Sequence, residues 1–322
     1  MSLDPRTWKV DPRQWKLDPR KWKLTGWRQT AAYVAFFALA FALALRLTFP
    51  VEAVKERLIL DASAEGYQVK VNDLAPSGIV GVRAREVTVT TADGTRIPIE
   101  ELAVGLRLWP TLRGRKSYSF DASIFDGRVV GFTDVGKTSE QYQARITGID
   151  LARAGVVRAA TGLDLAGTLA GNLDVTLDPK DPSKSTGTIA FEIKDWAIRG
   201  GKVAVPGMEG GLTVPSVKLG TVAARGTVKG GRADFATLES KGDDVDIVAE
   251  QFFVQLQPKV GHSALSGKAR VRPTEAFWRK EQVAPLKPLI EMGLASARGQ
   301  DGGFGFQFYG TLSKPQARPA AF

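Results

Sequence analysis

The chain has 322 residues, 43% hydrophobic and 24% charged, which is enough apolar material for at least one folded core. Its 34 glycines are typical of many strands and turns rather than of a helical bundle. The absence of cysteine excludes disulfides and thiolate metal sites. The formal charge is +10, and half of it lies in residues 1–28. No dense basic block follows residue 50, so nucleic acid is not an expected partner.

Residues 1–28 repeat a seven-residue unit, Asp-Pro-Arg-x-Trp-Lys plus an apolar residue, three times. A proline in every unit excludes a continuous helix. Two interpretations remain open: a tail held on anionic lipid by its cations and tryptophans, or a docking motif for a cytoplasmic partner. The candidate interaction or membrane-interface residues, including one beyond the tail, are Trp8, Trp15, Trp22, Trp27, Arg28 and Arg46.

Residues 29–49 predict a transmembrane helix. Thr30 to Leu45 contains no charge and no helix breaker, and the whole segment has the ~20 residues that a bilayer requires. Arg46 lies where its side chain can reach the interface. The excess of Lys and Arg before the segment predicts a cytoplasmic N-terminus and an exported remainder. The alternative is a cleavable signal peptide with Ala42-Leu43-Ala44 at the cleavage site, against which the 28 preceding residues argue.

Residues 50–312 predict a β-rich domain. A short helix is expected from Val51 to about Leu60, after which apolar and polar residues alternate, as in the segments 102–108 and 118–124. About a dozen such strands are separated by turn signals such as Asp126-Gly127 and Gly230-Gly231. Further helical segments are expected at 151–161 and 273–294. One apolar face, one polar face and short connections indicate antiparallel pairing.

The predicted fold is therefore mainly β: one N-terminal transmembrane helix, then an elongated, curved antiparallel sheet with two or three short helices. So few helices cannot cover the apolar face of a dozen strands. The sheet must roll on itself, form two layers or leave an apolar groove. Residues 313–322 are expected to form a flexible C-terminal tail.

The sequence predicts no catalytic residue, metal or cofactor. His262 is the sole histidine, which is too few for a triad or a metal site. Asp243, Asp244 and Asp246 lack the spacing of a calcium loop and are interpreted as a polar hairpin tip. The segment 113–116 (Arg-Gly-Arg-Lys) is interpreted as a solvated basic loop, with contact to lipid headgroups as the alternative.

The order of several segments carries a family resemblance. It rests on the runs Gly66–Val71 and Leu102–Pro110, on Phe125-Asp126-Gly127, on the helix expected after Ile149-Asp150-Leu151, and on Gly167-Thr168-Leu169. Over roughly residues 30 to 315, the chain resembles the protein N family of bacterial type II secretion systems (general secretion pathway protein N). It is also similar to AsmA-like envelope proteins, whose membrane anchor carries a grooved β-sheet.

The resemblance implies a non-catalytic accessory of a type II secretion system in the bacterial inner membrane, with most of the chain in the periplasm. The implied partners are the lipid bilayer, inner-membrane platform proteins of the machine and the outer-membrane secretin. The alternative is an AsmA-like lipid-binding or lipid-transfer module with lipid in an apolar β-groove. The family has no catalytic residues to carry over.

Overall fold

The chain divides into two units, residues 1–48 and 49–322, in a computed structural model. The structure describes residues 31–37, 39–40, 43, 51–64, 68–78, 80–90, 96–136, 138–155, 158, 162–203, 212–257 and 260–321. In the first unit the described residues are helical. No helix built from described residues is long and apolar enough to span a membrane. The tail 1–28 and more than half of the predicted span 29–49, Arg46 included, lie outside the described residues.

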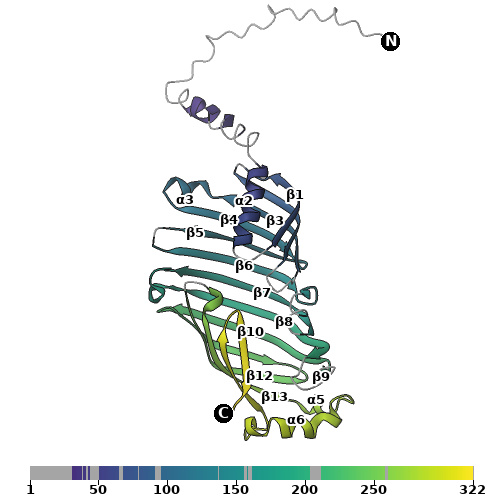
Figure 1. The fold of residues 1–322 in the computed structure, drawn as a ribbon. Helices are drawn as coiled ribbons and strands as arrows, with labels where there is room; N and C mark the ends of the chain where they lie inside the picture. The colour runs from purple at the N-terminus through teal and green to yellow at the C-terminus, as the bar shows by residue number, and fades with distance from the viewer. Residues whose placement is uncertain are drawn as a thin grey trace, which may run out of the picture. The chain divides into compact units, whose positions relative to one another are not determined.

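The second unit is one antiparallel sheet, which confirms the mainly β prediction (Figure 1). Strands β1 to β8 and then β10 to β15 pair in chain order, and β9 pairs with β8. The described strands are β1 (Gln68–Pro76), β2 (Gly81–Thr90), β3 (Arg96–Leu106), β4 (Lys116–Ile124), β5 (Gly127–Val135), β6 (Glu140–Asp150), β7 (Leu163–Leu177), β8 (Thr186–Val203), β9 (Leu212–Val214), β10 (Val217–Lys229), β11 (Arg232–Lys241), β12 (Val245–Gln255), β13 (Ala264–Pro273), β14 (Phe304–Thr311) and β15 (Lys314–Pro319).

The two faces of the sheet differ in polarity because side chains alternate along each strand. In β10, Val222, Ala224 and Val228 are buried, whereas the intervening Arg225 and Thr227 are exposed. Directly paired residues share a face, so one row of partners can be followed across the sheet. From β3 to β12 this row reads Val104, Phe120, Gly131, Ala144, Leu173, Ile189, Gly226, Phe235 and Phe252. Every member is apolar, and this side is called the apolar face below.

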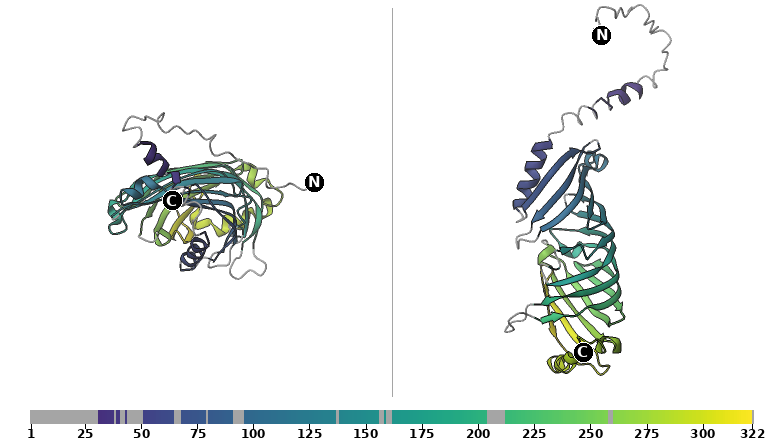
Figure 2. Two further views of the ribbon diagram at one scale, coloured as in Figure 1. Left: turned by 90° about the horizontal axis from the view of Figure 1, so that it is seen from above. Right: turned by 90° about the vertical axis from the view of Figure 1, so that its right-hand side faces the viewer.

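The apolar face is the concave face of the sheet. Helix α2 (Val51–Ala64) packs on it, since Lys55 and Ala62 line a small cavity with Val71 and Leu102. Seen from above, the sheet curves around the side on which α2 and the last strands lie (Figure 2). Helix α2 confirms the expected short helix and extends it to Ala64.

Pairing of phenylalanine with glycine fits the apolar face to this curvature. Four cross-strand pairs place a ring opposite a residue without a side chain: Phe120 with Gly131, Phe191 with Gly171, Phe235 with Gly226, and Phe308 with Gly267. A Cβ added at Gly226 would lie 2.9 Å from Cε1 of Phe235. At Gly131, too, the ring of the paired phenylalanine occupies the volume that a side chain would need, and glycine in a strand marks such a close approach.

The remaining helices are short and lie in connections. Helix α3 (Leu108–Leu112) follows β3, and α5 (Glu275–Trp278) and α6 (Lys287–Gly293) lie in the segment predicted to be a broken helix. The expected strand alternation through Leu108 was wrong at its end. Pro110 lies in the single turn of α3, where a missing N–H costs no helical hydrogen bond.

The C-terminal segment also differs from expectation. Residues 313–322 were predicted to be a flexible tail, but Lys314–Pro319 form β15, which pairs with β14 along its whole length. All of its side chains are exposed, so the sequence of this strand lacks the apolar alternation by which a strand is predicted. Pro315 and Pro319 lack an N–H and are tolerated because β15 is an edge strand.

Candidate functional site

The middle of the apolar face is only half covered. Tyr118 on β4 is 39% exposed, and Phe120, Val129, Ile146 and Leu169 are of intermediate exposure. In the described part of the second unit no helix makes extensive contact with β5–β8. The residues of β10 on the same face are nearly inaccessible to solvent. The residues of β4–β8 are therefore exposed because no other element packs on them, and not because the apolar alternation of the strands changes. This half-covered stretch of β4–β8 is called the open groove.

At its C-terminal end the groove becomes a cavity because the last strands curl over the sheet (Figure 1). Leu312, in the turn between β14 and β15, lines the same space as Tyr142 of β6 and Leu173 of β7. The cavity volume is about 410 Å³. Apart from the Tyr142 hydroxyl, every side chain that lines it is a hydrocarbon. The arrangement can take up an apolar chain and offers almost nothing to a polar solute.

An edge-to-face series of aromatic rings runs through this end of the apolar face. The ring centres of Phe191 and Phe235 are 6.5 Å apart, those of Phe235 and Phe252 are 5.8 Å apart, and those of Phe252 and Phe308 are 6.2 Å apart. Such contacts add to the burial of apolar area and restrict ring rotation. Phe235 also lines the cavity, so one of its walls is held by the series.

Tyr142 is the one polar group of the cavity wall. Its hydroxyl donates a hydrogen bond to Oε2 of Glu140 at 2.6 Å. Burial, with added contributions from that hydrogen bond and the Glu140 charge, raises the pKa of Tyr142 to about 12. The phenol is therefore neutral at physiological pH, and its oxygen can still accept a hydrogen bond from a ligand.

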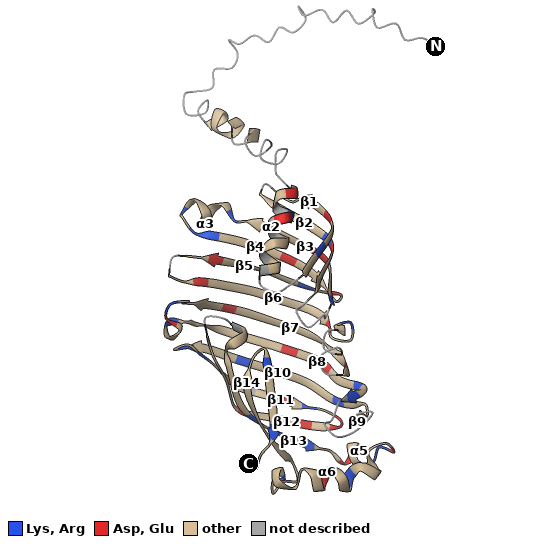
Figure 3. Ribbon diagram, in the orientation of Figure 1, with Lys and Arg blue, Asp and Glu red and all other residues tan. Residues whose placement is uncertain are grey.

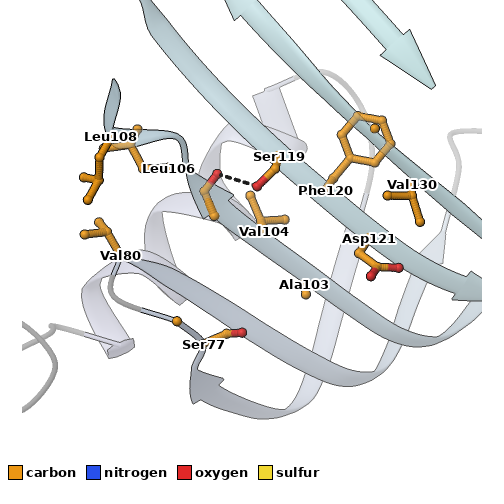
Figure 4. A pocket seen from close by; sticks show the side chains of 13 residues that line it. Ser77, Val80, Ala103, Val104, Leu106, Leu108, Ser119, Phe120, Asp121 and Val130 are labelled. Atoms are coloured by element: carbon orange, nitrogen blue, oxygen red, sulfur yellow. Dashed lines mark hydrogen bonds between the residues drawn. The ribbon is translucent and has the colours of Figure 1, made fainter. Parts of the chain in front are cut away.

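A further hollow, of about 570 Å³, is lined by the turn between β1 and β2 and by residues of β3–β5, and is shown in Figure 4. Of the 13 residues that line it, Asp121 alone is ionisable. Its carboxylate accepts from Nε of Arg128 at 2.7 Å, and this interaction lowers its pKa. Ser119 donates to the carbonyl oxygen of Gly105 at 3.3 Å. The lining thus contains no paired nucleophile and base, and we assign it no chemistry.

Neither a family model, nor a curated protein, nor a solved structure matches this chain. Function is therefore inferred from the groove, the cavity and the residue patterns. Lys/Arg and Asp/Glu are interspersed along the described sheet (Figure 3). Within the described ranges, no group of three or more His, Asp and Glu residues is placed to hold a metal ion.

The predicted interaction residues lie outside the described part of the chain, and their roles stay predictions. They are Trp8, Trp15, Trp22, Trp27, Arg28 and Arg46. His262 is exposed in a 3-10 turn, as expected. The polar-tip interpretation holds for Asp243, whose side chain is 74% exposed, but was wrong for Asp244, which is buried beneath Lys280.

The cavity residues were not singled out from the sequence. Tyr142 and Leu173 lie in strands whose alternation the sequence reveals, and Leu312 follows directly after strand β14. Their shared cavity has no local signal, because about 170 residues separate Tyr142 from Leu312.

Proposed function

We propose that this chain is an AsmA-like lipid-binding or lipid-transfer module of the bacterial envelope, which holds a lipid acyl chain on its apolar face. The observation that carries the proposal is the hydrocarbon-lined cavity of about 410 Å³. Leu173 lines this cavity and also belongs to the row of residues along the open groove. A ligand with an apolar tail can therefore lie in the cavity and extend along β6–β8.

The physical chemistry favours a lipid over other small ligands. The cavity lies within the ~300–1,000 Å³ range of small-molecule sites. A polar ligand would lose its hydration against this wall and regain at most a hydrogen bond to Tyr142. An acyl chain loses no hydrogen bond there and gains about 0.8 kcal/mol for each CH₂ removed from water.

The sequence supports an envelope location for this proposal. The apolar segment 29–49 and the cations before it favour a single membrane span with a cytoplasmic N-terminus. The β-rich second unit would then be periplasmic, beside the inner membrane from which a lipid is drawn.

A second candidate is a non-catalytic accessory of a type II secretion system that links the inner membrane to the periplasmic and outer-membrane parts of the machine. It is favoured by the resemblance to the protein N family and by the strand order. Strands paired one after another along a single sheet, about 4.8 Å apart, extend roughly 60 Å. A sheet of this length could serve as a spacer between the parts of the machine. Both candidate functions would hold if the groove bound lipid within a secretion assembly.

Native mass spectrometry of the full chain, extracted in mild detergent, tests the first candidate. We expect a population that retains phospholipid after the detergent is removed. A folded sample that carries no lipid, and takes up none from added vesicles, would refute the lipid-binding proposal.

The second candidate is tested in the native host. Deleting the gene should lower type II secretion and leave fewer intact secretin complexes. Normal secretion with an intact secretin would count against a place in that machine, and would leave the lipid result unaffected.

A further inference from the structure

The α3 turn presents exposed apolar side chains next to positive charge. Leu108, Trp109 and Leu112 are 43%, 65% and 79% exposed, and Leu112 is the most exposed large hydrophobic residue of the described chain. The Arg113 guanidinium carbon lies 4.8 Å from the centre of the Trp109 ring. Arg115 follows one glycine later. Such a combination is unusual for a solvated loop, because nothing on the sheet covers the apolar side chains.

The segment from Arg107 to Lys116 contains four cations and no acidic residue. Arg107 is neutralised by Asp134, whose Oδ1 lies 3.3 Å from its Nη1. Arg113, Arg115 and Lys116 are exposed and make no ion pair with any residue that the structure describes. In Figure 3 the α3 region carries blue and no red. Three positive charges are therefore available to a partner.

Hydrogen bonds hold this turn in one conformation. The Arg107 N–H donates to the carbonyl oxygen of Ser117 at 2.9 Å, and the Thr111 hydroxyl donates to the carbonyl oxygen of Arg107 at 2.8 Å. The N–H of Arg115 closes the loop on the carbonyl oxygen of Pro110 at 3.1 Å. Many of the polar backbone groups of the turn are thus satisfied internally. A segment that enters an apolar medium requires this, because unpaired backbone groups are costly there.

We propose that the α3 tip, Leu108 to Leu112, inserts into the interface of an anionic lipid bilayer while Arg113, Arg115 and Lys116 bind the lipid phosphates. Tryptophan and leucine at the tip suit the boundary between headgroups and acyl chains. Each nearby cation strengthens attachment to an anionic surface. The α3 tip lies towards the same end of the second unit as the start of α2 (Figure 1).

The size of the patch favours a bilayer over a protein partner. A stable protein interface buries ~800 Å² on each side with some twenty residues, whereas this patch consists of three apolar side chains on a five-residue helix. A few deeply inserted side chains and their flanking cations are sufficient for a membrane contact.

Helix α6 provides an internal comparison. Leu289 and Met292 on α6 are 55% and 72% exposed. The charges around them are mixed, since Glu291 lies on the helix and pairs with Arg298 at 3.6 Å. We therefore expect α6 to remain in water where α3 binds lipid.

The chain contains no cysteine, so Leu112→Cys creates a unique labelling site in the full-length protein. The variant carries an environment-sensitive fluorophore and is reconstituted into vesicles of phosphatidylethanolamine with phosphatidylglycerol. Quenchers attached to lipid and quenchers dissolved in water are then compared. We expect lipid-attached quenchers to act on the label at position 112 and aqueous quenchers to dominate for the matched control Met292→Cys.

Charge removal tests the second half of the proposal. Arg113→Gln, Arg115→Gln and Lys116→Gln should each lower the ratio of inserted to solvated label roughly fivefold. Phosphatidylcholine vesicles and high salt should act in the same direction, because both weaken attraction between the cations and the surface.

Equal aqueous quenching at positions 112 and 292 in anionic vesicles would overturn the proposal. If the label at position 112 inserts equally well without the three cations and in uncharged vesicles, the surface that α3 binds need not be anionic, and that part of the proposal is wrong. Protection of position 112 in cell membranes but not in pure lipid would assign α3 to a protein partner instead. None of these results depends on lipid in the cavity, so failure here is distinct from failure of the proposed function.

Discussion

Lys280 places its ammonium nitrogen 2.5 Å from Oδ2 of Asp244, a carboxylate that is only 4% exposed. The same oxygen accepts the backbone N–H of Lys218 at 2.5 Å, and Lys280 also donates to the carbonyl oxygen of Ser216 at 2.7 Å. The pair thereby ties the connection after α5 to the start of β10 and to the turn before β12. It closes the end of the sheet at which the apolar residues Val217, Leu219 and Val245 are buried.

Asp244→Ala should destabilise the second unit by about 3 kcal/mol, because the half-buried Lys280 ammonium and the backbone N–H of Lys218 both lose this buried acceptor. The measurement is the urea midpoint of the full chain in a single detergent, followed by circular dichroism. Asp243→Ala is the matched control: it removes a neighbouring carboxylate that is 74% exposed, paired with an equally solvated Lys218. The control should change stability by less than about 0.5 kcal/mol. Equal effects would show that burial of Asp244 contributes nothing.

Gly267→Ala should destabilise the sheet by about 1–3 kcal/mol, because the new methyl group meets the ring of Phe252. That ring cannot move aside, since Phe235 and Phe308 contact it on either side. Gly293→Ala in α6 is the control. A Cβ there has nothing within 4 Å, and alanine favours the helix, so stability should be unchanged or rise by up to about 1 kcal/mol. Comparison of the two thermal midpoints is the test, and a harmless Gly267→Ala would refute the packing role of glycine on the apolar face.

Leu312→Trp should lower the amount of lipid that co-purifies with the chain, because the larger side chain fills the cavity. Leu312→Asp should lower it further, since it places a charge against the hydrocarbon wall. Leu312 is 41% exposed, so both variants should fold. Lipid per protein is counted by native mass spectrometry. Leu289→Asp adds the same charge to an exposed residue outside the cavity, and this control should retain lipid. An equal loss of lipid in all three variants would show that lipid does not bind in the cavity.

Alkaline pH should destabilise the fold partly through Tyr142. Its pKa rises from 10.0 to about 12 on folding, so the native state holds this proton more tightly than the unfolded state does. The stabilising contribution is therefore complete below pH 10 and is lost as the pH rises towards 12. Tyr142→Phe should show a shallower loss of stability over this interval. Parallel pH profiles of the wild type and the variant would disprove the assignment, and difference spectra of tyrosinate would report the pKa directly.

Most of the strands of this protein and their antiparallel pairing follow from the sequence alone, because both depend on local patterns; β15, whose side chains are all exposed, does not. Alternation with a period of two identifies one apolar face, and short turns between strands require antiparallel neighbours. The predicted Gly230-Gly231 turn is observed: both residues have positive φ, and Lys229 pairs with Arg232. A Gly-Gly pair does not always mark a turn, since Gly200 and Gly201 lie inside β8.

What covers the apolar face was decided only by the tertiary structure. The sequence leaves a rolled sheet, two layers and an open groove as equal solutions, because strands with one apolar face satisfy all three. The outcome depends on curvature summed over many strands, which the Phe–Gly pairs accommodate, and on the return of Leu312 to Tyr142. The burial of Asp244 beneath Lys280 is non-local in the same way. Local periodicity determines which side chains share a face, whereas packing over long sequence separations determines which of them form a cavity.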